Sequence, residues 1–179
     1  QRQMCIRDSI RRPEHLDLVL DPDAAAATAP ALAQPDPTAG EPWGDASAAL
    51  RRLLLDSVGA DPDADRPLAA VTGKDAAVAL RRAYRRQLAA IALRDLDSAE
   101  PTAAMPSVGR WLADLAGATV DAALAVSRAV LTEREGPVVD RVDLAVIGMG
   151  KCGAGELNYV SDVDVVFAHA VREAADGVG

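Results

Sequence analysis

Two aspartates separated by one residue stand at the head of an apolar segment late in the chain. Asp162 and Asp164 flank Val163, and the β-branched stretch Val163–Ala168 predicts a buried strand. Alternate side chains of a strand share a face, so both carboxylates should point the same way, with Cα atoms about 6.6 Å apart, while the valines point into the core. Paired carboxylates suit hard cations such as Mg²⁺. Two such ions can stabilise the attacking and leaving oxygens of a phosphoryl or nucleotidyl transfer.

A glycine-rich turn precedes these aspartates. Gly148, Gly150 and Gly153 lie within six positions, at the end of the apolar run Val142–Met149 and just after it. The apolar run predicts another buried strand. Glycine lets backbone N–H groups approach phosphate oxygens closely. Lys151 would add a point charge on a phosphate, and Ser161 would add a hydroxyl donor. The predicted nucleotide- and phosphate-binding residues are therefore Gly150, Lys151, Gly153, Ala154 and Ser161.

Three other interpretations compete for the same residues. Gly148-x-Gly150-x-x-Gly153 matches a dinucleotide-binding fingerprint, but that site needs a parallel crossover of a dozen or more residues. The stretch 154–161 is too short to supply one. A Walker-type loop fails because no Gly-Lys-Ser/Thr follows at the required spacing. A plain tight turn between strands leaves two carboxylates at the start of an apolar strand unexplained, so metal-dependent transfer is favoured.

The segment 148–167 also resembles a known signature. It reads Gly-Met-Gly-Lys-Cys-Gly-Ala-Gly-Glu-Leu-Asn-Tyr-Val-Ser-Asp-Val-Asp-Val-Val-Phe and is similar to that of the glutamine synthetase adenylyltransferase/adenylyl-removing enzymes, members of the DNA polymerase β-like nucleotidyltransferases. The family pattern is a glycine, eleven residues and Asp-x-Asp, here Gly150 followed by Asp162 and Asp164. The resemblance extends over about residues 80–168.

The resemblance implies a particular reaction. Family enzymes carry two copies of this domain: one removes AMP from a tyrosine of glutamine synthetase by phosphorolysis, and the other attaches AMP from ATP. The stretch Asn158–Ser161 is more similar to the removing copy, so we expect that activity with Mg²⁺ held by Asp162 and Asp164. The implied partners are glutamine synthetase, ATP or ADP, orthophosphate and a nitrogen-signalling regulatory protein. AMP attachment is one alternative, and a regulatory module that binds without chemistry is another.

The chain departs from the family pattern at two positions and lacks one feature. Gly155 stands where an arginine is usual, which puts one phosphate or structural contact in doubt. Cys152 stands where leucine is common, and we expect a small buried residue there rather than a nucleophile. Polymerase β-like sites use a third carboxylate on a later strand, and Asp176 lies in too glycine-rich a tail to supply it. We therefore expect the chain by itself to show little turnover.

The composition excludes several classes of protein. Lys and Arg number 19 against 27 Asp and Glu, a net charge of −8, which argues against nucleic-acid binding. No run approaches the ~18 apolar residues of a membrane helix, so no membrane association is expected. Two cysteines rule out a disulfide framework and fit a reducing, cytoplasmic location.

Helices should position the motif. Apolar spacing predicts helices over 46–58, 74–96 and 107–134, with a short helix within 10–20 and a linker over 21–44. Four arginines lie on the second of the long helices, as a solvated face or as a patch for a phosphate or an acidic partner. They are Arg81, Arg82, Arg85 and Arg86.

Together these patterns predict an α+β chain. A helical lead-in is followed by the first strands of a small mixed-sheet nucleotidyltransferase fold, which we expect to be truncated. Residues 1–9 read as a possible non-native leader. Residues 10–106 form the lead-in with its Pro/Ala-rich linkers, and residues 107–179 start an incomplete catalytic domain.

Overall fold

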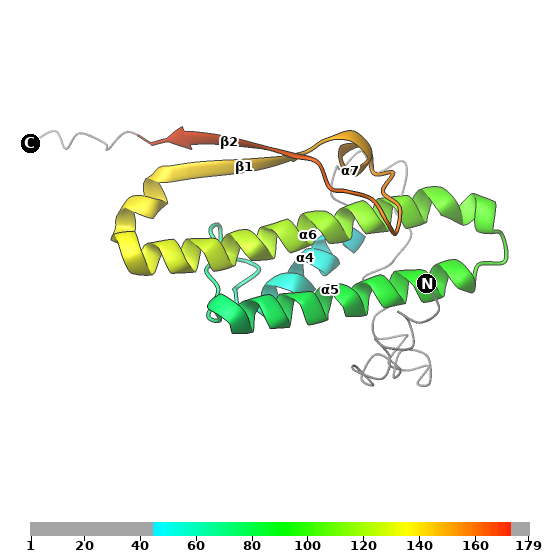
Figure 1. Cartoon of the computed structure of the whole chain (residues 1–179), viewed down its shortest axis with the longest axis horizontal. Helices are drawn as coiled ribbons and strands as arrows, with labels where there is room; N and C mark the ends of the chain where they lie inside the picture. Colours follow the sequence, from blue (N-terminus) through cyan, green and yellow to red (C-terminus); the bar gives the residue numbers. More distant parts are fainter. Residues whose placement is uncertain (1–44, 173–179) are drawn as a thin grey trace, which may run out of the picture.

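A computed structural model describes residues 45–172 and confirms the α+β class. Three helices pack together, and a β-hairpin lies along one side of the longest helix (Figure 1). The predictions for the leader, for the short helix within 10–20, for the linker 21–44 and for Asp176 fall outside the described residues.

The first two long helices form as their apolar spacing predicts. Helix α4 spans Asp45–Ser57 and α5 spans Gly73–Leu96. Gly59 follows α4 with φ +67°, a left-handed conformation that glycine adopts without a Cβ clash. On α4 the side chains of Leu50, Leu54 and Leu55 are buried, whereas Leu53 is 39% exposed.

Helix α6 corrects one predicted boundary. It spans Pro101–Glu135, six residues longer at its start than the helix that we predicted from Ser107. Pro101 suits the first helical position because a backbone N–H at that position has no partner within the helix, so proline loses no hydrogen bond there. Pro106, which directly precedes the predicted helix, lies inside the observed one. Proline at this position removes one backbone hydrogen bond near the start of α6. Packing of the residues that follow Pro106 maintains the helix.

The core lies where α6 packs against both α4 and α5. Alanines supply much of the contact surface of α6, which lets the helices approach closely. By length and composition α6 could cross a membrane, yet its buried side packs on the other two helices, as in the core helix of a helical domain. The large buried side chains in this core include Leu50, Leu54, Leu55, Val58, Ile91, Trp111, Leu112 and Leu115.

The hairpin joins the helices through a 3₁₀ turn, η3, over Gly136–Arg141. Strands β1, Val142–Gly148, and β2, Val165–Val171, pair in antiparallel register from Val142 opposite Val171 to Gly148 opposite Val165. The second strand thus begins two residues later than we predicted from Val163, and the first ends one residue before Met149.

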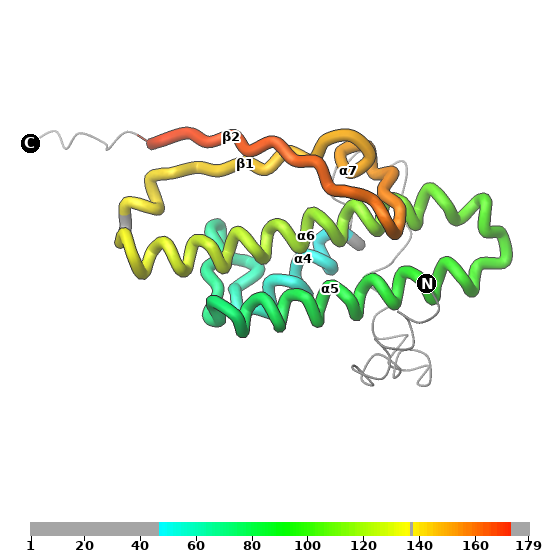
Figure 2. The backbone as a smooth tube through the Cα atoms, viewed as in Figure 1, coloured from blue at the N-terminus to red at the C-terminus, as the bar shows by residue number. Residues whose placement is uncertain are grey.

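The prediction that both strands are buried is wrong for the described chain. Ile147 is 49% exposed and Phe167 is 65% exposed. The physical reason is that an open cleft separates the inner face of the hairpin from the helices, and no described helix or strand forms a layer over its outer face (Figure 2). An isolated hairpin is marginal in water, so contacts to the helices must hold it in place.

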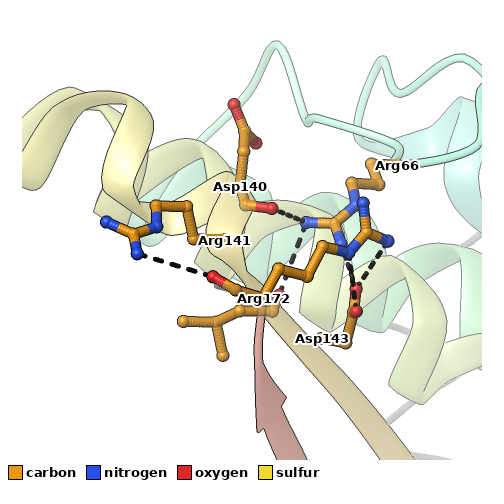
Figure 3. A network of polar contacts seen from close by, with 6 residues as sticks. Arg66, Asp140, Arg141, Asp143 and Arg172 are labelled. Atoms are coloured by element: carbon orange, nitrogen blue, oxygen red, sulfur yellow. Dashed lines mark hydrogen bonds and ion pairs between the residues drawn. The ribbon is translucent and has the colours of Figure 1, made fainter. Parts of the chain in front are cut away.

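A network of charges fastens the base of the hairpin (Figure 3). The Arg66 guanidinium donates to the backbone carbonyl of Asp140 at 2.7 Å and forms an ion pair with Asp143. Arg172, just beyond β2, donates to both carboxylate oxygens of Asp143 at 2.7 and 2.9 Å. One carboxylate therefore ties the loop before α5 to both strands at the base of the hairpin.

We expect this network to make stability depend on pH. Hydrogen bonding to Arg172, with the nearby arginine charges, lowers the pKa of Asp143. A lowered pKa means that the contribution is present above the unfolded value of about 3.9 and is lost as pH falls through the lower folded value. Urea unfolding should therefore find Asp143→Asn less stable than wild type at pH 7, with the difference shrinking below about pH 4.

High salt at pH 7 provides the control, because screening weakens exposed ion pairs in the wild type but not in the variant. A difference between the two proteins that stayed constant from pH 7 to pH 2.5 would contradict this account.

Candidate active site

The glycine-rich turn contains a five-residue helix, α7, over Gly150–Ala154. It folds back on β1 so closely that the backbones of Gly153 and Gly148 are in contact. A Cβ built on Gly153 would lie 2.3 Å from the carbonyl oxygen of Gly148, so only glycine fits. The Gly153 N–H donates to the Met149 carbonyl at 3.1 Å and is used within the turn.

The two aspartates precede β2 instead of lying within it. Val163 and Val165 line a cleft of about 730 Å³ between the hairpin and the helices, whereas Asp162 and Asp164 do not line it and are exposed. By the alternation of an extended chain, both carboxylates face away from the helices. The valines thus face the helices, but they line an open cleft, and the prediction that they lie in the core is wrong: Val163 is 41% exposed.

The structure brings the glycine turn and one aspartate together. The Met149 N–H donates to the Asp164 carbonyl at 2.8 Å, which extends the strand pairing by one step. A Cβ built on Gly150, whose φ is +53°, would lie 3.6 Å from Oδ2 of Asp164. Lys151 follows on α7 and is exposed, and Ala154 is the last residue of α7.

Ser161 takes part in a local turn. Its hydroxyl donates to Oδ1 of Asn158 at 2.8 Å, and the same oxygen accepts the Val160 N–H at 3.1 Å. This pattern is a side-chain-stabilised turn of the kind asparagine favours. The hydroxyl that we predicted as a phosphate donor therefore has a protein partner one residue before Asp162.

An ion pair on the inner face was not among the predicted residues. Arg110 Nε donates to Oδ1 of Asp114 at 3.1 Å, and Asp114 is buried. A Cβ on Gly155 would lie 3.1 Å from Cδ of Arg110, so a guanidinium stands beside the position where the family signature usually has an arginine. The i, i+4 spacing of the pair was the only available sequence signal.

Cys152 is half-buried between two carboxylates. Burial raises the pKa of its thiol, and the charges of Asp114 and Asp164 raise it further. Because the thiolate is the nucleophilic form, this environment supports the interpretation of Cys152 as a packing residue.

The two carboxylates beside the turn are suitable ligands for a hard cation, but they are fewer than such a cation needs. Asp162 and Asp164 offer carboxylate oxygens of the kind Mg²⁺ prefers. Within residues 45–172 no cluster of three or more His, Cys, Asp or Glu side chains could hold a metal ion. The described residues thus supply two carboxylates and no third ligand beside them, and metal binding by Asp162 and Asp164 stays a prediction.

The arginine cluster lies on another part of the molecule. All four side chains belong to α5, which packs on the side of α6 opposite the hairpin (Figure 1). Arg81, Arg82 and Arg85 are exposed, and Arg86 is half-buried. The structure does not bring this cluster to the glycine turn, which favours its interpretation as a solvated face.

A helical lead-in carrying a hairpin, with paired aspartates beside a glycine-rich turn, is typical of a nucleotidyltransferase domain. The antiparallel pairing of β1 and β2 excludes the dinucleotide-binding interpretation, which requires parallel strands. The family model described as glutamate-ammonia ligase adenylyltransferase matches residues 16–179. The chain belongs to this family.

Similar curated proteins are named bifunctional glutamine synthetase adenylyltransferase/adenylyl-removing enzyme. The protein from Bifidobacterium longum is 49% identical over 129 residues, 70% of this chain and 11% of the relative. Those from Nocardia farcinica and Streptomyces coelicolor are 51% and 53% identical, over 60% and 55% of this chain and 10% and 9% of the relatives. No solved structure matches. The chain spans about a tenth of the length of the curated relatives it matches.

Proposed function

We propose that this chain is part of the adenylyl-removing domain, which releases AMP from a tyrosine of glutamine synthetase by phosphorolysis. The observation that carries the proposal is the exposed Asp162–Asp164 pair beside the turn at Gly150. Membership of the family and the names of its relatives support nucleotidyl transfer and glutamine synthetase as the substrate.

In the proposed reaction an oxygen of orthophosphate attacks the phosphorus of AMP. The bond from phosphorus to the tyrosine oxygen breaks, the tyrosine oxygen takes up a proton, and ADP is formed. Mg²⁺, held by Asp162 and Asp164, would offset the charge that develops on the phosphoryl oxygens. Lys151 is the nearby basic side chain on α7 that we assign to the phosphates. We also propose a cytoplasmic location and a nitrogen-signalling regulatory protein as partner.

The choice of removal over attachment rests on the resemblance of Asn158–Ser161 to the removing copy. Attachment of AMP from ATP remains the second candidate, since the relatives are named for both activities. The same carboxylates would serve either reaction, because both are displacements at the phosphorus of AMP. The tyrosine oxygen leaves when orthophosphate removes AMP, and it attacks when ATP donates AMP and releases pyrophosphate.

The whole protein provides the test. AMP release from adenylylated glutamine synthetase should require added orthophosphate and should yield ADP. Asp162→Asn should abolish this release, while attachment of AMP from ATP by the other copy of the domain survives. Both reactions can be followed with radiolabelled AMP on glutamine synthetase.

The reverse result, with attachment lost and phosphate-dependent removal intact, would assign these residues to the attaching copy. If Asp162→Asn changed neither reaction, the chain would be a regulatory or binding module.

A further inference from the structure

The connection between α7 and β2 carries the two aspartates, yet residues 155–164 form no helix or strand. Its last residue pairs with β1 through the Met149–Asp164 hydrogen bond. At the other end the Glu156 N–H donates to the Lys151 carbonyl at 2.8 Å. Backbone pairing thus holds the two ends and leaves the middle of the connection, which leads to Asp162, to be held by other contacts. Contacts to the helical lead-in must supply the remaining restraint.

Two packing contacts fix the first part of this connection on α6. Leu157 is 8% exposed and belongs to the same buried cluster as the helices. Gly109 of α6 lies so close that a Cβ there would be 3.4 Å from the carbonyl oxygens of Gly155 and Leu157. Figure 2 shows the connection descending from the hairpin to α6.

A hydrogen bond to α5 fixes the next part. The Tyr159 hydroxyl donates to Oδ2 of Asp95 at 2.9 Å, across 64 positions in sequence. Asp95 lies in the last turn of α5. Partial burial, and then the bond to Asp95, raise the pKa of the Tyr159 phenol. The phenol therefore remains a donor at neutral pH.

The local turn links this anchor to the aspartates. Asn158 and Ser161 close a turn that encloses Tyr159, and Asp162 follows immediately. A closed turn transmits the position of one residue to the next with little freedom. A shift at Tyr159 should therefore displace the carboxylate of Asp162.

We propose that Tyr159 and Asp95 are positioning residues for the metal ligands, so that the end of α5 sets the geometry of Asp162 and Asp164. The inference rests on the proposed function, because it takes these aspartates as metal ligands. It adds that the helical lead-in acts as the support of the site through this hydrogen bond. A misplacement of about 1 Å in such a site can cost on the order of 10²-fold in rate.

The test uses the whole protein and Mn²⁺ as the probe, with binding followed by electron paramagnetic resonance. Asp162→Asn defines the part of the Mn²⁺ binding that belongs to this site. Tyr159→Phe keeps the ring and removes the hydroxyl, and it should weaken binding at this site on the order of tenfold. Asp95→Ala should weaken Mn²⁺ binding as much as Tyr159→Phe does. Asp95→Asn keeps an acceptor oxygen for the Tyr159 hydroxyl and should weaken Mn²⁺ binding less.

The matched control is Tyr84→Phe, which removes the hydroxyl of the chain's other tyrosine, on the middle of α5. Its Mn²⁺ binding should equal that of wild type. The double variant Tyr159→Phe with Asp95→Ala should bind no more weakly than either single variant, since both remove one interaction. Thermal unfolding should stay within a degree or two of wild type in all of them, which separates positioning from loss of fold.

Wild-type Mn²⁺ binding by Tyr159→Phe, with binding lost in Asp162→Asn, would overturn the positioning role and leave the metal site standing. Unchanged binding in Asp162→Asn would overturn the metal assignment itself, and the positioning role with it. A loss in Tyr84→Phe equal to that in Tyr159→Phe would also overturn the specific role of the Tyr159–Asp95 bond.

Discussion

Asp162→Asn and Asp164→Asn should each lower the rate of AMP transfer at this site by at least a hundredfold. Asparagine keeps the shape of aspartate but removes the anionic oxygen that holds a divalent cation. Loss of one electrostatic contact to the transition state costs about 3–4 kcal/mol, which corresponds to roughly 10² to 10³ in rate. The measurement is the single-turnover rate in the whole protein at saturating Mg²⁺.

A change outside the motif serves as the control. Val171→Ala alters an exposed residue at the end of β2 and should leave the rate within a few-fold of wild type. If both asparagine variants kept near-normal rates with Mg²⁺ present, the metal assignment would have to be abandoned.

The second large effect is expected at Gly153. In Gly153→Ala the new methyl group would meet the Gly148 carbonyl at 2.3 Å, and backbone atoms cannot yield as a side-chain end does. Either α7 moves away from β1 or the Gly153–Met149 hydrogen bond breaks. Overpacking of this kind costs about 1–3 kcal/mol, and displacement of the turn beside Asp164 should lower the rate by on the order of tenfold or more.

A small substitution away from the turn offers the control. Ala103→Ser adds one atom at an exposed position of α6 and should change neither the urea midpoint nor the rate appreciably. Equal urea midpoints and equal rates for Gly153→Ala and wild type would show that the turn tolerates the larger residue.

Local signals were sufficient for much of this molecule. Apolar spacing placed α4 and α5 within one residue of their observed bounds. The β-branched runs placed both strands, and the glycine spacing with Asp-x-Asp identified the family that the profile match confirms. These features depend on residues near one another in sequence, because helix periodicity and turn geometry are local properties.

The start of α6 and the setting of the strands were not predictable in this way. Pro106 is a local stop signal, and packing of α6 against the other helices overrides it. The strand sequences are apolar enough to be buried, but the exposure of a strand depends on the layers that cover it. In the described chain an open cleft lies on one face of the hairpin and no helix or strand covers the other.

Motif spacing and apolar periodicity were enough to predict the fold class, the family and the candidate ligands Asp162 and Asp164. How these two residues are held depends on contacts between distant parts of the chain. The pairing of Tyr159 with Asp95, the close approach of Gly109 and the Arg66–Asp143–Arg172 network join residues far apart in sequence. Such contacts depend on the relative placement of whole helices and strands, and no local periodicity encodes that placement.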